Sequence, residues 1–362
     1  MKIPAIFPGE GVERIMFKYV LYSCCLVGLI LICACGKREM TAADEKLITE
    51  IIQETNLENG NNNHARNLLH GDKILNLVKN LNDRDKIYYA KAFAYQTKGY
   101  HYYLRRDIFT ANSYYLQSMK YADRIRYNKD LRIAAKSDSY HHFYILFFRK
   151  KQLAEFWLGQ WGKFFLEYMN TPEYRNGNKQ SNSILLMRYG VYIEAKVEYL
   201  SKAGKVDSAV EQLNALYSEV KKFYSDPDEF LWAFPLSDTA AGIFARKNDS
   251  EKMILFARKT LKLAEQDNIF PENSYFILIR DLTKKGDYSA AEKYCLQGLK
   301  LWQKSQVKPL LSWKIQLMIM LAEIRWRSGD KRRAQEILSQ AERLKPPPDF
   351  MEKIKKFQKE WF

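Results

Sequence analysis

The fold of this chain is decided by the stretch MIMLAEIRWRSGDKRRAQEILSQAERLKPPP, residues 318–348. Gly329 can adopt the left-handed conformation that ends a helix, and Asp330 can cap the helix that follows. Small side chains at Ala322 and Ala334, on either side of this turn, allow two antiparallel helices to approach closely. Three consecutive prolines, 346–348, then stop the second helix. The stretch therefore predicts a helical hairpin.

The same pattern recurs toward the N-terminus. The preceding unit has Tyr275, Gly286-Asp287 and Ala291 in the corresponding places, and earlier units are more degenerate. The intervals between units are longer than the about 34 residues of the standard helix-pair repeat, which indicates lengthened helices or loops. The small residue of each predicted second helix marks one unit: Ala111, Ala154, Ala209, Met253, Ala291 and Ala334.

These units resemble the tetratricopeptide repeat, and their length resembles that of the repeats in bacterial sensory and peptide-receptor regulators. The resemblance covers residues 86–345 and implies an all-α, right-handed superhelical solenoid of antiparallel helix pairs. Each pair has an apolar face that it can bury only by stacking on its neighbours. Residues 346–362 are predicted to form a capping helix, with a membrane-touching amphipathic helix as the alternative. The resemblance names no ligand, because this fold serves many unrelated partners.

The composition agrees with an all-α fold. The 362 residues are 47% hydrophobic and 14% aromatic, which excludes wholesale disorder, and 16 Gly and 10 Pro are too few for the many turns of a β-sandwich. A net charge of +16 favours anionic partners, although a solvated basic surface explains it equally well. We do not expect nucleic acid as a partner, because the sequence has no zinc-finger spacing and no RNA-binding strand motif.

The first 34 residues have the layout of a bacterial signal peptide. Basic residues precede a nearly continuous apolar run over 19–34, with Met16 as an alternative start. The segment 31–36, LICACG, resembles the lipobox, in which the cysteine becomes diacylated and N-terminal. Cys35 is therefore the predicted lipidation site, and the resemblance as a whole is to a bacterial tetratricopeptide-repeat lipoprotein. An uncleaved transmembrane anchor is the alternative.

Residues 35–85 are predicted to form a lipid-anchored tether followed by two helices. The first helix is expected at 41–57 and the second at 65–81. The intervening ENGNNN, residues 58–63, is expected to be a loop, because Asn and Gly tolerate positive φ and Asn side chains compete for backbone hydrogen bonds.

Aromatic, charged and polar residues occupy the first-helix positions that line the concave groove of tetratricopeptide proteins. Aromatic and Arg side chains in such a groove suit an extended or helical peptide, so we expect a peptide or protein partner. Packing between repeats explains the same residues equally well. The predicted groove consists of Gln96, Tyr100, Tyr103, Glu194, Glu198, Phe276, Arg280, Thr283, Glu323 and Trp326.

Sequence motifs for catalysis are lacking. The chain has no Walker loop, GxGxxG, HExxH or CxxC, and the adjacent His141 and His142 point too far apart on a helix to share a metal. We therefore expect no enzyme activity, no cofactor and no metal, and a lipid-anchored binding protein of the bacterial envelope, on the outer membrane or facing the periplasm. The alternatives are the sensory domain of a regulator whose output is on another polypeptide, or an enzyme of unknown class.

Overall fold

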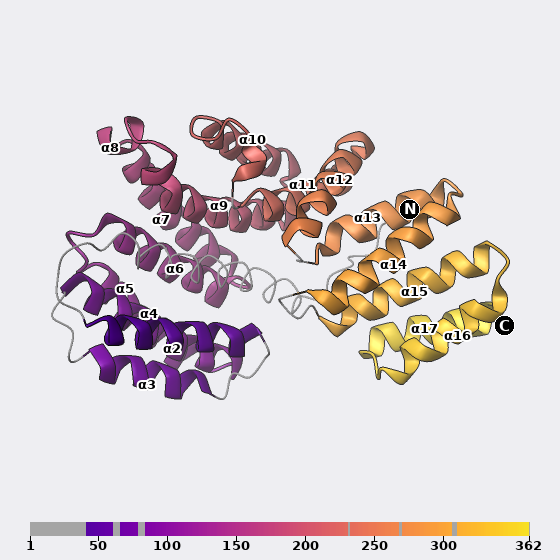
Figure 1. Ribbon diagram of the computed structural model, residues 1–362, viewed down its shortest axis with the longest axis horizontal. Coiled ribbons are helices and arrows are strands. Elements are labelled where there is room, and N and C mark those ends of the chain that lie inside the picture. Colours follow the sequence, from indigo (N-terminus) through magenta and orange to yellow (C-terminus); the bar gives the residue numbers. More distant parts are fainter. Residues whose placement is uncertain are drawn as a thin grey trace. The chain divides into compact units, whose positions relative to one another are not determined.

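The computed structural model describes residues 41–60, 66–78, 84–230, 232–267, 270–305 and 310–361. The predicted signal segment 1–34 and Cys35 lie outside these residues. The described residues form α-helices, with one 3-10 helix and no strand among them (Figure 1). The predicted all-α fold is confirmed.

The chain divides into two compact units, which are described separately. Unit 1 comprises the residues up to Lys196 together with Leu216–Ser225, and unit 2 comprises Val197–Ala215 and Asp226–Phe362. The helices of unit 1 are α2 (Ala42–Gly60), α3 (Asn67–Leu77), α4 (Arg84–Leu104), α5 (Ile108–Ala122), α6 (Lys129–Phe147), α7 (Lys151–Met169) and α8 (Pro172–Arg175). Two helices contribute residues to both units, α9 (Lys179–Lys202) and α10 (Val206–Val220). Unit 2 contains η3 (Pro227–Glu229), α11 (Ala233–Lys247), α12 (Ser250–Asp267), α13 (Glu272–Lys284), α14 (Tyr288–Lys304), α15 (Leu311–Arg327), α16 (Lys331–Arg343) and α17 (Pro348–Trp361).

Helices that are consecutive in the chain pack against each other as pairs. In unit 1 these pairs are α4 with α5 and α6 with α7, and in unit 2 they are α11 with α12, α13 with α14 and α15 with α16. The first helix of a pair also packs on the first helix of the next pair, as α4 does on α6 and α13 does on α15. Stacking of this kind joins the cores of single pairs into the continuous interior of a helical solenoid.

The predicted small residues occupy one equivalent position in their helices. In each second helix the backbone N–H of this residue donates to the carbonyl of the residue four positions earlier, with N···O distances of 3.0–3.1 Å. The five alanines are fully buried, while the larger Met253 is half-buried. The structure therefore confirms the aligned positions Ala111, Ala154, Ala209, Met253, Ala291 and Ala334.

Most turns between paired helices share one conformation, and the turn between α6 and α7 is the exception. A residue with φ between 59° and 90° ends the first helix in five of them, and three of these residues are the glycines 204, 286 and 329. Arg106 and Asn248 adopt the same left-handed conformation without being glycine. At several turns an aspartate follows and its side chain accepts a hydrogen bond from the backbone three residues later, as Asp330 does from Arg333 at 3.2 Å. This predicted cap is confirmed.

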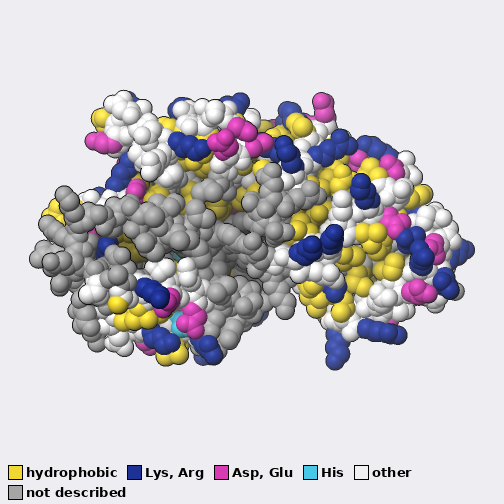
Figure 2. Space-filling model, viewed as in Figure 1, with side chains coloured by type: hydrophobic (Ala, Val, Ile, Leu, Met, Phe, Trp, Pro, Cys, Tyr) yellow, Lys and Arg dark blue, Asp and Glu magenta, His cyan; other side chains and the backbone are white. Residues whose placement is uncertain are grey.

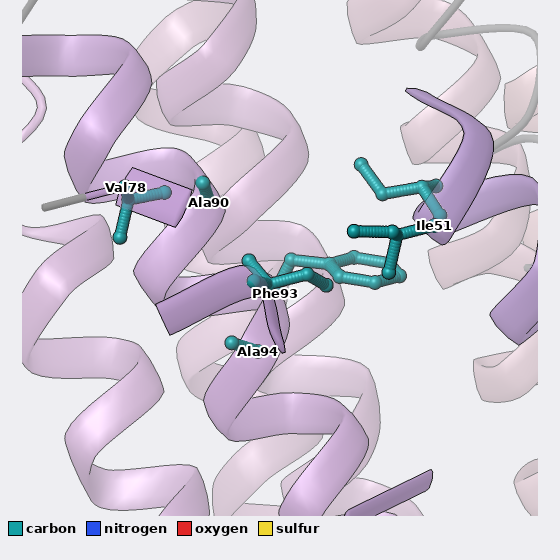
Figure 3. Close-up of a cluster of buried hydrophobic side chains, with 7 residues drawn as sticks. Ile51, Val78, Ala90, Phe93 and Ala94 are labelled. Carbon is teal, nitrogen blue, oxygen red and sulfur yellow. The ribbon is translucent and has the colours of Figure 1, made fainter. Parts of the chain in front are cut away.

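The first two described helices pack on α4 through a small apolar core. Phe93 of α4 reaches toward Ile51 of α2, with Val78 at the end of α3 on the other side (Figure 3). Helix α2 continues to Gly60, so the expectation that the loop begins at Glu58 was wrong. A helix that has already formed continues through Asn and Glu at little cost, and Gly is the residue type at which helices commonly end.

Helix α17 covers the end of the last pair. Its Ile354 is fully buried and packs in one cluster with Ile319 of α15 and with Leu338 and Ala341 of α16. Without α17 this apolar face would be open to water, which a terminal repeat must avoid.

Candidate functional site

The predicted groove residues of unit 1 lie mostly inside the helix stack. Gln96 of α4 is buried, and its amide donates to the Ala135 carbonyl at 3.3 Å and to Ser139 Oγ at 3.2 Å. Tyr100 is also buried and stacks on Tyr103 with ring centres 6.1 Å apart. Gln96 therefore holds α4 against α6, and Tyr103, which is half-buried, is the more accessible member of this group.

The two predicted glutamates of α9 also have structural surroundings. Glu194, in unit 1, is buried. Glu198, in unit 2, pairs with Lys202 one turn later, with Oε1 2.6 Å from Nζ. The negative charge of Glu198 also raises the pKa of Arg246, against a larger lowering by burial. A role of either glutamate in ligand binding stays a prediction.

The adjacent histidines belong to the core of unit 1. Both imidazoles are buried, and burial is the largest cause that lowers the pKa of each, to about 4 for His142. His142 Nδ1 donates to the Asp138 carbonyl at 2.7 Å, while the Asp138 carboxylate pairs with the fully buried Arg188 at 2.5 Å. Across the described ranges no three His, Cys, Asp or Glu side chains form a group that could hold a metal ion. The pair therefore packs as neutral core residues.

Unit 2 carries the predicted residues that remain partly accessible. Phe276, Arg280, Thr283, Glu323 and Trp326 are all half-buried, on α13 and α15. The hydroxyl of Thr283 donates to the Ile279 carbonyl of its own helix at 2.7 Å. On the face of unit 2 turned to the viewer in Figure 2, hydrophobic side chains gather around α14 and α15 between Lys and Arg side chains.

Charged side chains from three helices meet on this part of unit 2. Arg280 comes from α13, Glu323 from α15 and Lys353 from α17, and all three are half-buried. Burial is the largest cause that lowers the pKa of Arg280, and the Glu323 carboxylate opposes it. Burial also lowers the pKa of Lys353, and the Arg280 charge lowers it further. The two cations therefore lie close enough to repel each other.

An aromatic stack adjoins the charged group. Trp326 stacks on Trp361 with ring centres 5.4 Å apart and planes inclined by 8°. Trp361 also stacks on Phe357 at 4.2 Å, and the Lys331 ammonium lies 4.7 Å from the centre of the Trp326 ring. The site thus combines cations with a rigid aromatic surface, which is the composition of a binding hot spot.

The C-terminal helix supplies residues that the sequence did not assign to the site. The segment was predicted to cap the repeats, and Ile354 does so, but Trp361 of the same helix also stacks on Trp326 of α15, and Lys353 and Phe357 lie on the same side of α17 as Trp361. The signal was present in the sequence, because these three residues recur at intervals of four and share one side of a helix.

Two further observations concern membrane-spanning helices and the thiol of Cys295. No helix in the described part of the chain is both long enough and apolar enough to cross a membrane. Cys295 of α14 is fully buried and free, and burial raises its pKa, as expected for a thiol packed in the core.

Comparison with known proteins supports the fold and does not identify a family. No protein-family model matches the sequence, and no curated protein matches it. Among solved structures, the chain is similar to a Rap protein that was crystallised in complex with competence and sporulation factor. The TM-score is 0.50 at 10% sequence identity, and the match covers 97% of this chain and 99% of that chain. At this identity the likeness shows the fold alone, and that fold is a tetratricopeptide-like stack of helix pairs.

Proposed function

We propose that this chain is a non-enzymatic, lipid-anchored protein of the bacterial envelope that binds a peptide or protein partner, as a scaffold or as the sensor of a signalling system. The Rap protein whose fold it shares was crystallised with competence and sporulation factor, which supports a peptide ligand. Attachment through Cys35 rests on the lipobox-like sequence around it.

The observation that carries the binding function is the composition of the site on α13, α15 and α17. Its aromatic rings are held in place by stacking on each other, so binding costs little side-chain entropy. Its cations are already partly desolvated, which strengthens their interaction with an anionic ligand. A site of this kind is preorganised to hold a ligand.

Affinity capture tests this function. The full chain with Tyr103→Ala and Trp326→Ala is used as bait on native membranes beside the unchanged chain, and bound partners are quantified by mass spectrometry. Control chains carry Leu116→Ala or Leu296→Ala, at half-exposed positions on the second helices α5 and α14. We expect a partner that the unchanged and control chains capture and the Tyr103–Trp326 double variant loses.

The alternative explanation for capture is nonspecific charge attraction. Capture that the double variant retains, and that disappears at high salt for every chain, would mean that simple charge attraction by this basic protein explains binding. Helix content, measured by circular dichroism, is expected to be the same for all variants, because both substituted side chains lie at partly exposed positions.

A further inference from the structure

Arg280 and Lys353 are partly buried cations, and both feel the attraction of the Glu323 carboxylate. Within the described part of the chain, neither has a hydrogen bond from its charged group or a carboxylate oxygen within 4.0 Å. The Lys353 ammonium lies 5.8 Å from the centre of the Phe357 ring. A desolvated cation without a partner lowers the stability of a fold, so its presence calls for an explanation.

The one carboxylate of the group is already engaged. Glu323 Oε1 accepts from Nε of Arg327 at 3.0 Å and lies 2.9 Å from Nη2 of the same guanidinium. The single Glu323 carboxylate is therefore shared by Arg327, Arg280 and Lys353, and positive charge remains in excess. The group therefore attracts an anionic ligand.

The aromatic stack closes this group on one side. Lys353 contacts Phe357, Phe357 stacks on Trp361, and Trp361 stacks on Trp326. Trp326 follows Glu323 by three positions, so both lie on the same side of α15. Lys353 therefore borders a rigid apolar surface of the kind against which a peptide side chain packs, and Arg280 is linked to this group through the charges of Glu323 and Lys353.

From this arrangement we propose that Arg280 and Lys353 bind a carboxylate group of a peptide ligand, with the adjacent residues of the ligand packed on the Trp326–Trp361 stack. The guanidinium fork matches a carboxylate in geometry, and the ammonium adds a compact second charge. The inference rests on the proposed peptide-binding function. The carboxylate belongs either to the C-terminus of the ligand or to an Asp or Glu side chain.

Synthetic peptides of random sequence test the inference and separate these two sources. The full chain in detergent is offered three matched sets of octapeptides, which have a free C-terminus and no Asp or Glu, an amidated C-terminus with Asp and Glu, or an amidated C-terminus without them. Affinities for selected peptides are measured by fluorescence anisotropy. Binding to the first set alone identifies a C-terminus, and binding to the second identifies an acidic side chain.

The variants assign the binding to the two cations. Arg280→Met and Lys353→Met keep much of the aliphatic stem and remove the charge, and each is expected to weaken binding about tenfold or more, the usual effect of losing a charge-assisted hydrogen bond. Lys355→Met, at an exposed position of the same helix, is the matched control and is expected to leave the affinity unchanged. Arg280→Lys keeps the charge and is expected to retain part of the affinity.

Two other results would contradict the carboxylate site or the peptide-binding function. Equal binding of all three peptide sets, insensitive to Arg280→Met and Lys353→Met, would overturn the carboxylate site and leave the peptide-binding function in place. Binding of none of the sets would contradict the peptide-binding function itself, and this inference with it. Circular dichroism of each variant verifies that the helices are intact.

Discussion

Gly99 of α4 lies directly against the ring of Tyr115 in α5. A Cβ added at Gly99 would come within 2.4 Å of Tyr115 Cε1, and the tyrosine is fully buried, so its ring has no free space to move into. We expect Gly99→Ala to lower the free energy of unfolding by about 1–3 kcal/mol through overpacking. Urea unfolding followed by circular dichroism measures the change.

Gly159 provides the matched control for this substitution. It lies in the exposed face of α7, where an added Cβ would meet nothing within 4 Å. Gly159→Ala should therefore raise stability by about 0.5–1 kcal/mol through helix propensity alone. Similar effects at the two glycines would show that α4 and α5 are not packed as closely as described.

The repeated alanine position predicts a second effect on stability. Ala334 is fully buried where α16 meets its neighbours, so Ala334→Leu should cost on the order of 1–3 kcal/mol by forcing the last pair apart. Gln335→Leu, one position later on the exposed side of α16, adds a similar side chain without this cost. Thermal unfolding of the two variants compares them, and equal melting temperatures would contradict the alignment of the repeats.

The buried histidines predict a loss of stability in mild acid. Burial lowers the pKa of His142 from 6.5 to about 4, so between these pH values the unfolded chain binds a proton that the folded chain does not. His142 alone should therefore destabilise the fold by on the order of 3 kcal/mol as the pH falls through this window, and His141 adds in the same direction.

A substitution isolates this contribution. His142→Phe retains an aromatic ring beside Tyr115, whose ring centre lies 5.0 Å from that of His142, and it removes the titrating group. The stability of this variant at neutral pH is expected to change, but its decline between pH 6.5 and 4 should be shallower than that of the parent. Parallel curves from urea unfolding would show that His142 is not the source.

The two cations that we propose to bind the ligand repel each other. We therefore expect them to lower the stability of the fold when no ligand is bound. Arg280→Met removes a partly buried cation and its repulsion of Lys353, so the pKa of Lys353 should rise. In the absence of ligand we expect this variant to be more stable by up to about 1 kcal/mol, because the aliphatic stem is largely kept. A clear fall in melting temperature at low salt would instead indicate that Arg280 is held by a favourable ion pair.

The N-terminal sequence predicts that Cys35 is the first residue of the mature chain and carries lipid. Expressed in its own source cells, the Cys35→Ser chain should remain an uncleaved precursor of higher mass without fatty acid, because only a thiol forms the thioether to diacylglycerol. Mass spectrometry of the native N-terminus measures this directly. An unmodified Cys35 still joined to Ala34 would favour the transmembrane anchor.

The turns and helix contacts of the fold could be predicted from the sequence because they depend on local chemistry. Gly329 and Asp330 specify a helix end and a helix start within two residues, and Ala334 marks the close contact that follows. The end of α2 was less predictable, since a run containing Asn and Gly is compatible with both a loop and the last turn of a helix.

The site was predicted only in part, because the first helix of each pair has more than one packed side. Gln96 has the polar character of a groove residue, but Ser139 and the Ala135 carbonyl satisfy its amide inside unit 1. For Lys353 the local sequence shows only the side of the helix that it shares with Phe357 and Trp361. The effect of the Arg280 charge on Lys353 depends on the folded chain, because the two residues are far apart in the sequence.

The left-handed turns have a consequence for how such a chain is recognised. Arg106 and Asn248 adopt at their turns the backbone geometry that Gly204, Gly286 and Gly329 adopt at the others. What recurs along this chain is a dihedral angle, and the amino acid that adopts it varies. The amino-acid pattern of the repeat is therefore lost wherever glycine is replaced, whereas the backbone angle still marks where one helix of a pair ends.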